Sequence, residues 1–137
     1  MKKNKSFLIF GLLLCCLLSL KLKAQTSWIA DQTTGGISFY HRFSICNGDS
    51  VVLLKFINTT ERALVVRWNE LFNTQLETGI SGWRGIKQLV LQPGVTSSEN
   101  CDELLFPACV IKRTDISPAY KASFISFSFT NIIIAEQ

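Results

Sequence analysis

Apolar and polar side chains alternate at every second position along most of this chain. In residues 37–45 the odd positions are Ile, Phe, His, Phe and Ile, which is the pattern of a strand with one buried face. Asn47-Gly48 follows, and because both residues tolerate positive φ, the pair predicts a tight hairpin turn. Residues 51–57 continue the alternation as the return strand, and residues 63–70 carry it into a third strand. The first half of the chain therefore predicts a hairpin followed by a third strand.

The second half resumes this pattern after an irregular, glycine-rich stretch over residues 71–85. Strands are predicted at residues 86–91, 109–112 and 122–135, separated by turn residues. No segment beyond residue 24 shows the 3.6-residue period that a helix requires. The pattern therefore predicts an all-β fold, an antiparallel β-sandwich of Ig-like size with about seven strands. A small barrel is the alternative.

The terminal predicted strand carries many large apolar side chains. Ile125, Phe127 and Phe129 alternate with serines, so we expect these three side chains to share one buried face. Phe124 before them and Ile132-Ile133-Ile134 after them add further large apolar groups, which favours a central strand buried on both faces. An exposed edge is the alternative, and such an edge would invite a partner protein to add a strand. Residues 25–34, in contrast, are expected to be loosely held.

Residues 1–24 have the pattern of a secretory signal peptide. Three lysines precede an uncharged apolar run of 14 residues, and Ala24 stands just before Gln25, the expected first residue of the exported chain. As a helix this run would span about 21 Å, short of the roughly 30 Å hydrocarbon core, so no stable transmembrane anchor is expected. An uncleaved anchor is the alternative. We expect a single domain, residues 25–137, exported to the periplasm, the cell surface or the extracellular space.

Removal of the leader changes the charge of the chain. The full sequence has 14 basic and 10 acidic residues, but five of the lysines lie in residues 1–24, so residues 25–137 keep nine basic and ten acidic residues. A nearly neutral domain lacks the positive potential that phosphate backbones require, which excludes nucleic acid as a partner.

The chemistry-bearing residues do not form a catalytic set. His41 is the one histidine, it lies mid-strand, and no nucleophile motif accompanies it, so we interpret it as structural. Asp102 and Glu103 are neighbours in one loop, which does not predict the facing carboxylates of a glycosidase. The sequence contains no His pair, no Cys-x-x-Cys and no acidic loop with calcium-ligand spacing. We therefore expect a protein without enzymatic activity, metal or cofactor.

Three cysteines follow the leader, namely Cys46, Cys101 and Cys109. In an oxidising compartment this number predicts one disulfide and one leftover thiol. A Cys101–Cys109 bond would close a short loop, whereas Cys46 with either partner would close a longer one and stabilise more in the chain-entropy model. The sequence leaves these pairings open. The leftover thiol is expected to be buried and inert, with pairing to a second chain as the alternative.

Trp83 and Arg84 are the candidate ligand-binding residues. They lie in a glycine-rich loop, where a flat apolar ring beside a fork-shaped donor suits sugar rings and partner side chains. The alternative is that Trp83 folds back to cap one end of the sandwich. Trp68, in contrast, is in phase with the apolar positions of its strand and is predicted to lie in the core.

Four features carry a family resemblance: the leader ending Lys23-Ala24-Gln25, Cys46, the run over residues 52–58 and the run over residues 89–94. The leader resembles those of Bacteroidota-type bacteria, and the rest of the chain is similar to their small exported β-sandwich proteins. The resemblance implies an exported β-sandwich.

The leader and the strand pattern favour an exported β-sandwich protein, and the sequence shows no set of catalytic residues. We therefore expect a non-enzymatic exported protein that binds a protein partner or serves as a cell-envelope accessory. A carbohydrate-binding module that holds a glycan through Trp83 and Arg84 is the alternative.

Overall fold

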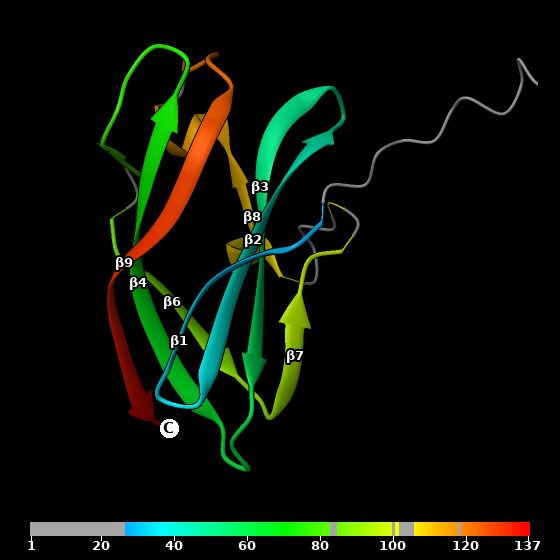
Figure 1. Ribbon diagram of the computed structural model, residues 1–137, viewed down its shortest axis with the longest axis vertical. Helices are drawn as coiled ribbons and strands as arrows, with labels where there is room; N and C mark the ends of the chain where they lie inside the picture. Colours follow the sequence, from blue (N-terminus) through cyan, green and yellow to red (C-terminus); the bar gives the residue numbers. More distant parts are fainter. Residues whose placement is uncertain (1–26, 83–84, 100, 102–105, 118) are drawn as a thin grey trace, which may run out of the picture.

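The computed structural model describes residues 27–82, 85–99, 101, 106–117 and 119–137. Over these residues the chain forms nine strands and two short 3-10 turns, arranged as two antiparallel sheets that pack against each other (Figure 1). The predicted all-β sandwich is confirmed, with nine strands in place of about seven. The two sheets stay separate, so the barrel alternative is wrong.

The first sheet, sheet A, is built on the predicted hairpin, whereas the third predicted strand, over residues 63–70, lies in the other sheet. Its strands are β1 (Ile29–Thr34), β2 (Ile37–Cys46), β3 (Asp49–Asn58), β7 (Gly94–Ser97) and β8 (Val110–Lys112). The order is β1-β2-β3, and β7 and β8 pair with opposite ends of β3 on its other side. Asn47 and Gly48 have φ of 52° and 84°, the positive values that the predicted hairpin turn requires.

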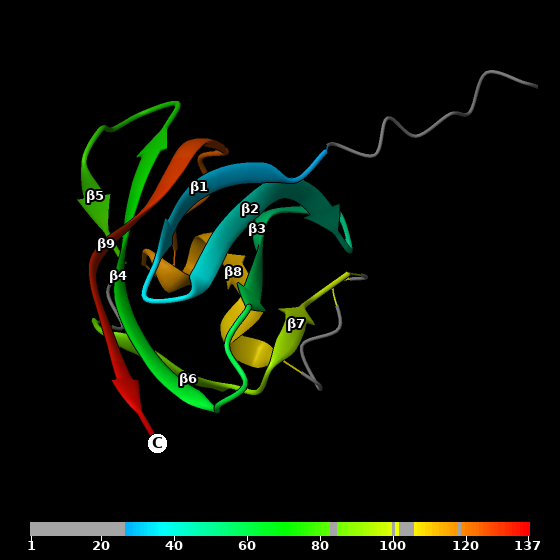
Figure 2. The same cartoon turned by 60° about the horizontal axis from the view of Figure 1, so that its bottom comes forward.

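The second sheet, sheet B, is organised around one long strand, β4 (Leu64–Thr74). On one side β4 pairs with β9 (Phe124–Glu136), and on the other with β6 (Lys87–Leu91) and β5 (Ile80–Ser81). The end view in Figure 2 shows β4 and β9 as the layer opposite β2 and β3. β4 thus continues four residues beyond the predicted end at residue 70. The prediction ended too early because the sequence that follows has no regular alternation.

Aromatic side chains fill the space between the sheets. Neighbouring rings of this cluster lie 4.9–6.2 Å apart between centroids, in edge-to-face and tilted arrangements that favour ring pairing. The cluster consists of Phe39, Phe56, Trp68, Phe72, Phe127 and Phe129. Trp68 is fully buried here, which confirms its predicted place in the core.

β9 does not alternate regularly along its length. Its register with β4 shifts twice, and each shift inserts an extra residue into β9, once near Ile125 and once near Asn131. Such bulges reset the phase of a strand, so Phe124, Phe127 and Phe129 all face the core whereas Ile125 is 60% exposed. The prediction that Ile125 shares the buried face is therefore wrong, because strict period-2 counting does not allow for a bulge.

β9 is also not a central strand. Among the described residues it pairs with β4 alone, so it forms one edge of sheet B, and Ile133 on its outer side is exposed. The expectation of a strand buried on both faces is wrong, and the alternative of an edge is correct. The large apolar residues beyond Phe129 are explained by the second bulge, after which the side chains of Ile132 and Ile134 pack against the core.

Three further differences concern strand ends. Residues 29–34 are held in β1 by pairing with β2, where a loose segment was expected. Ile45 is 66% exposed rather than on the buried face, because at this end of β2 it is the opposite side, with Cys46, that is covered. No strand was predicted directly after residues 86–91, but β7 begins at Gly94, where a φ of 103° turns the chain from sheet B into sheet A.

Candidate functional site

The predicted ligand-binding residues Trp83 and Arg84 lie outside the described residues, as does the leader over residues 1–24. The carboxylates Asp102 and Glu103, which the sequence did not favour as a catalytic pair, also lie outside them. Glycan binding by the Trp83 loop and cleavage of the leader therefore stay predictions.

The cysteines pair across sheet A. Cys46 and Cys101 form a disulfide with a Cα–Cα distance of 5.8 Å, which joins the end of β2 to the segment after β7, and Cys109 stays free. This is one of the pairings that the sequence left open. A bond between Cys101 and Cys109 is excluded because the two side chains lie on opposite faces of sheet A: Cys109 packs in the main core, whereas Cys101 packs outside with Cys46.

Burial raises the pKa of the Cys109 thiol from 9.0 to about 12. A thiol that stays protonated and is fully shielded from solvent is a poor nucleophile, which matches the inert role expected of it.

The outer face of sheet A carries a second small cluster beside the disulfide. Val51, Leu53 and Val110 are buried there beneath Trp28. The guanidinium of Arg42 lies 4.6 Å from the ring centroid of Trp28, and it also donates a hydrogen bond to the carbonyl of Glu99. These contacts fasten both the N-terminal segment and the segment after β7 to the sheet, so we assign this cluster a structural role.

His41 has a carboxylate partner on the edge strand β1. Its Nδ1 lies 2.7 Å from Oδ2 of Asp31, and the ring packs between Phe43 and Phe127. Asp31 reaches it because a β-bulge follows Ala30. Among the described residues no serine, threonine or cysteine forms a hydrogen bond to this ring, so the pair lacks the nucleophile of a catalytic triad. The contact with Asp31 and the packing of the ring against Phe43 and Phe127 are consistent with the interpretation of His41 as a structural residue.

The outer face of sheet B carries an apolar strip beside the β9 edge. Val65 on β4 pairs with Val90 on one side and Ala135 on the other, and Ile133 follows next along β9. We call Val65, Val90, Ile133 and Ala135 the sheet B strip. Arg67 lies beside it, with Nε donating to Oε1 of Gln88 at 2.7 Å.

A hollow runs along this strip. Its volume is about 170 Å³, and it is lined by three members of the strip together with Arg67 and Glu136. This volume suits a side chain better than a free ligand.

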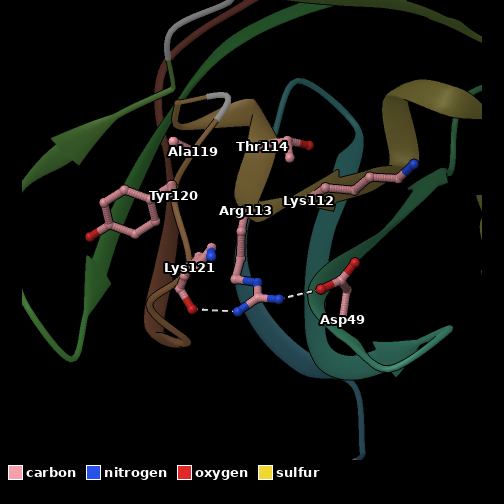
Figure 3. Close-up of a pocket in the computed structure, with 7 residues that line it drawn as sticks. All are labelled: Asp49, Lys112, Arg113, Thr114, Ala119, Tyr120 and Lys121. Carbon is pink, nitrogen blue, oxygen red and sulfur yellow. Dashed lines mark hydrogen bonds and ion pairs between the residues drawn. The ribbon is translucent and has the colours of Figure 1, made fainter.

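A larger pocket, of about 360 Å³, opens near the start of β3. Figure 3 shows its lining residues, which come from β3, from the end of β8, from the 3-10 turn η2 (Arg113–Asp115) and from the segment before β9. They are Asp49, Lys112, Arg113, Thr114, Ala119, Tyr120 and Lys121. Sequence reasoning missed this pocket, because its residues are scattered between loops and strand ends and only the fold brings Asp49 to Arg113.

No three His, Cys, Asp or Glu side chains of the described residues lie together as a metal-binding group. In the same part of the chain, no helix has the length and apolar character needed to cross a bilayer. Comparison with family models, curated proteins and solved structures found no match.

Proposed function

We propose that this protein is an exported, non-enzymatic β-sandwich that binds a protein partner through strand addition at β9, as an accessory of the cell envelope. Strand addition extends a sheet by main-chain hydrogen bonds to an open edge, and side chains beside the edge select the partner.

The observation that supports this proposal is the open edge of β9. The strand is 13 residues long and, among the described residues, pairs only with β4. From Phe124 to Ala135 it contains no charged residue and no proline, the two residue classes that usually protect an edge. Its two bulges leave a regular stretch between them, where Ser128 points to the outer face.

The other edges in the described structure carry protection of kinds that β9 lacks. β1 is bulged, as β9 is, but it also has the inward-turned carboxylate of Asp31. The remaining edge strands, β5 to β8, have five residues or fewer. Short edges and edges with inward-pointing charges resist pairing. β9 is long and has no such charge, which supports a functional use of its edge.

The sheet B strip supplies side-chain contacts beside this edge. Ile133 and Ala135 belong both to β9 and to the strip, so a strand added to β9 extends an apolar surface that already reaches Val65. Apolar contacts of this kind add affinity, because they are removed from water together with the new strand.

The experiment is capture of envelope proteins by the tagged full chain and by Ser128→Lys, after covalent crosslinking. A lysine on the outer face of the regular stretch adds the charge that protects natural edges, and we expect recovery of the partner to fall about tenfold. Val95→Lys is the matched control, because Val95 is an exposed residue of β7 in the other sheet. Equal recovery with Ser128→Lys and with the unchanged chain contradicts the proposal.

Export is tested separately by the mass of the protein after expression of the full chain. Cleavage of the leader predicts a product that starts at Gln25. A product that retains residues 1–24 contradicts this part of the proposal.

A further inference from the structure

We propose that the pocket between the start of β3 and the segment before β9 binds a small organic anion, through a carboxylate or phosphate group. The pocket of about 360 Å³ is at the lower end of the range for small-molecule sites, roughly 300–1,000 Å³. This site is independent of the β9 edge, so either proposal can fail without the other.

Arg113 is held in a fixed position by two acceptors from separate parts of the fold. Its Nη2 donates to Oδ1 of Asp49 at the start of β3, and its Nη1 donates to the carbonyl of Lys121 (Figure 3). A guanidinium has five N–H groups, so three remain for a ligand. A planar fork whose orientation is already fixed loses little entropy when it binds an oxyanion.

Basic residues outnumber acidic ones in the lining of the pocket. Lys112, Arg113 and Lys121 are three of the nine basic residues of residues 25–137, and Asp49 is the one acid among the lining residues. Asp49 offsets the charge of Arg113, and no ion pair to Lys121 is found among the described residues. In a nearly neutral domain this local excess attracts an anion.

The floor and one wall of the pocket are fixed as well. The Asp115 carboxylate accepts a hydrogen bond of 2.8 Å from the Lys112 amide, which holds the turn that carries Arg113. The Tyr120 hydroxyl lies 2.6 Å from Oγ1 of Thr74, which ties the opposite wall to the end of β4. The aromatic ring of Tyr120 in a pocket lined by cations suits a ligand with an apolar ring face and an acid group, such as a sugar acid.

The test is an NMR titration of the protein purified from cells that express the full chain, with glucuronate, inorganic phosphate and uncharged glucose. We expect saturable shifts of the amides of Thr114 and Lys121 with glucuronate, with phosphate or with both, and none with glucose. A response to glucuronate alone assigns a carboxylate ligand, and a response to phosphate alone assigns a phosphate ligand.

Charge variants make the result specific to the pocket. Arg113→Gln and Lys121→Gln are expected to weaken binding about fivefold or more, because each removes a charge-assisted hydrogen bond. Asp49→Asn keeps an oxygen that can accept the hydrogen bond from Arg113 but removes the competing negative charge, and is expected to strengthen binding about threefold. Arg62→Gln is the control, since it removes an exposed basic residue that pairs with Glu136 away from the pocket.

Three results would overturn the inference: shifts by glucose equal to those of the anions, no saturable shift with either anion, or an affinity that is the same in Asp49→Asn and Lys121→Gln as in the unchanged protein. Because Asp49 and Lys121 are exposed, these two variants are expected to fold even if Arg113→Gln does not.

Discussion

The carboxylate of Asp31 and the imidazole of His41 meet at 2.7 Å across the β1–β2 pair, in the one place where β1 is bulged. The bond holds an acidic side chain of an edge strand toward the interior, an arrangement that makes an edge unsuitable for pairing with another chain. Because the edge of β1 is protected in this way, β9 is the longest edge of the described residues without an inward-pointing charge, and it is the edge on which we propose that a partner binds.

Removal of the Asp31 carboxylate is expected to destabilise the fold. In Asp31→Ala the buried Nδ1 of His41 loses its partner, which costs about 1–3 kcal/mol. Urea unfolding measures this loss. Gln32→Ala, at an exposed position of the same strand, is expected to stay within about 0.5 kcal/mol. Equal stability of Asp31→Ala and the unchanged protein would show that the bond adds nothing.

Because of the bulge near Ile125, truncation to alanine is expected to destabilise the fold strongly at one apolar position of β9 and hardly at all two residues away. Phe127→Ala removes a ring from the core and is expected to cost about 3–5 kcal/mol. Ile125→Ala removes an exposed side chain and is expected to change the free energy of unfolding by less than about 0.5 kcal/mol. Both values come from urea unfolding. Similar large losses at the two positions would mean that Ile125 faces the core, and the bulge would then be absent.

The disulfide is expected to stabilise the fold by closing a long loop. Cys46 and Cys101 are 55 residues apart, and reduction is expected to lower the free energy of unfolding by about 2–4 kcal/mol. Unfolding with and without reductant measures this difference. Cys109→Ala should keep the full effect of reductant, whereas Cys101→Ser should lose it. An effect of reductant that survives in Cys101→Ser would contradict the Cys46–Cys101 pairing.

Cys109 predicts a loss of stability at alkaline pH. Below pH 9.0 the thiol is protonated in both the folded and the unfolded protein. Between pH 9.0 and about 12 only the unfolded chain releases the proton, because burial raises the pKa of the folded thiol. Stability therefore falls with rising pH over this range, by about 1.4 kcal/mol per unit from this group. Cys109→Ala lacks this contribution, so urea unfolding at pH 8 and pH 10 should show a smaller pH effect in the variant. Equal pH effects in both proteins would contradict the burial of the thiol.

The sequence predicted correctly those features of the fold that depend on residues close together in the chain. Alternation and the Asn47-Gly48 turn were sufficient for the β2–β3 hairpin, and the phase of Trp68 placed it in the core. The phase of Ile125 failed because a bulge is imposed by the strand that lies opposite, and the sequence of β9 contains no mark of it.

Contacts between distant segments were beyond the same reasoning. The choice of Cys46 as the partner of Cys101 depends on which face of sheet A each cysteine occupies. The pocket at Arg113 likewise requires Asp49, which is 64 residues away in the chain. Spacing along the sequence contains no information on either contact.

The position of a partner on β9 can be measured directly by photocrosslinking in the cells that make the protein. A photoreactive p-benzoylphenylalanine replaces Ile125 in one variant and Val95 in another. The two positions are matched, at 60% and 65% exposure, but lie in different sheets. Our account predicts a discrete crosslinked protein from position 125 that disappears when Ser128→Lys is added, and no such product from position 95. Crosslinks that are equal at the two positions, or that persist with Ser128→Lys, would contradict binding at the β9 edge.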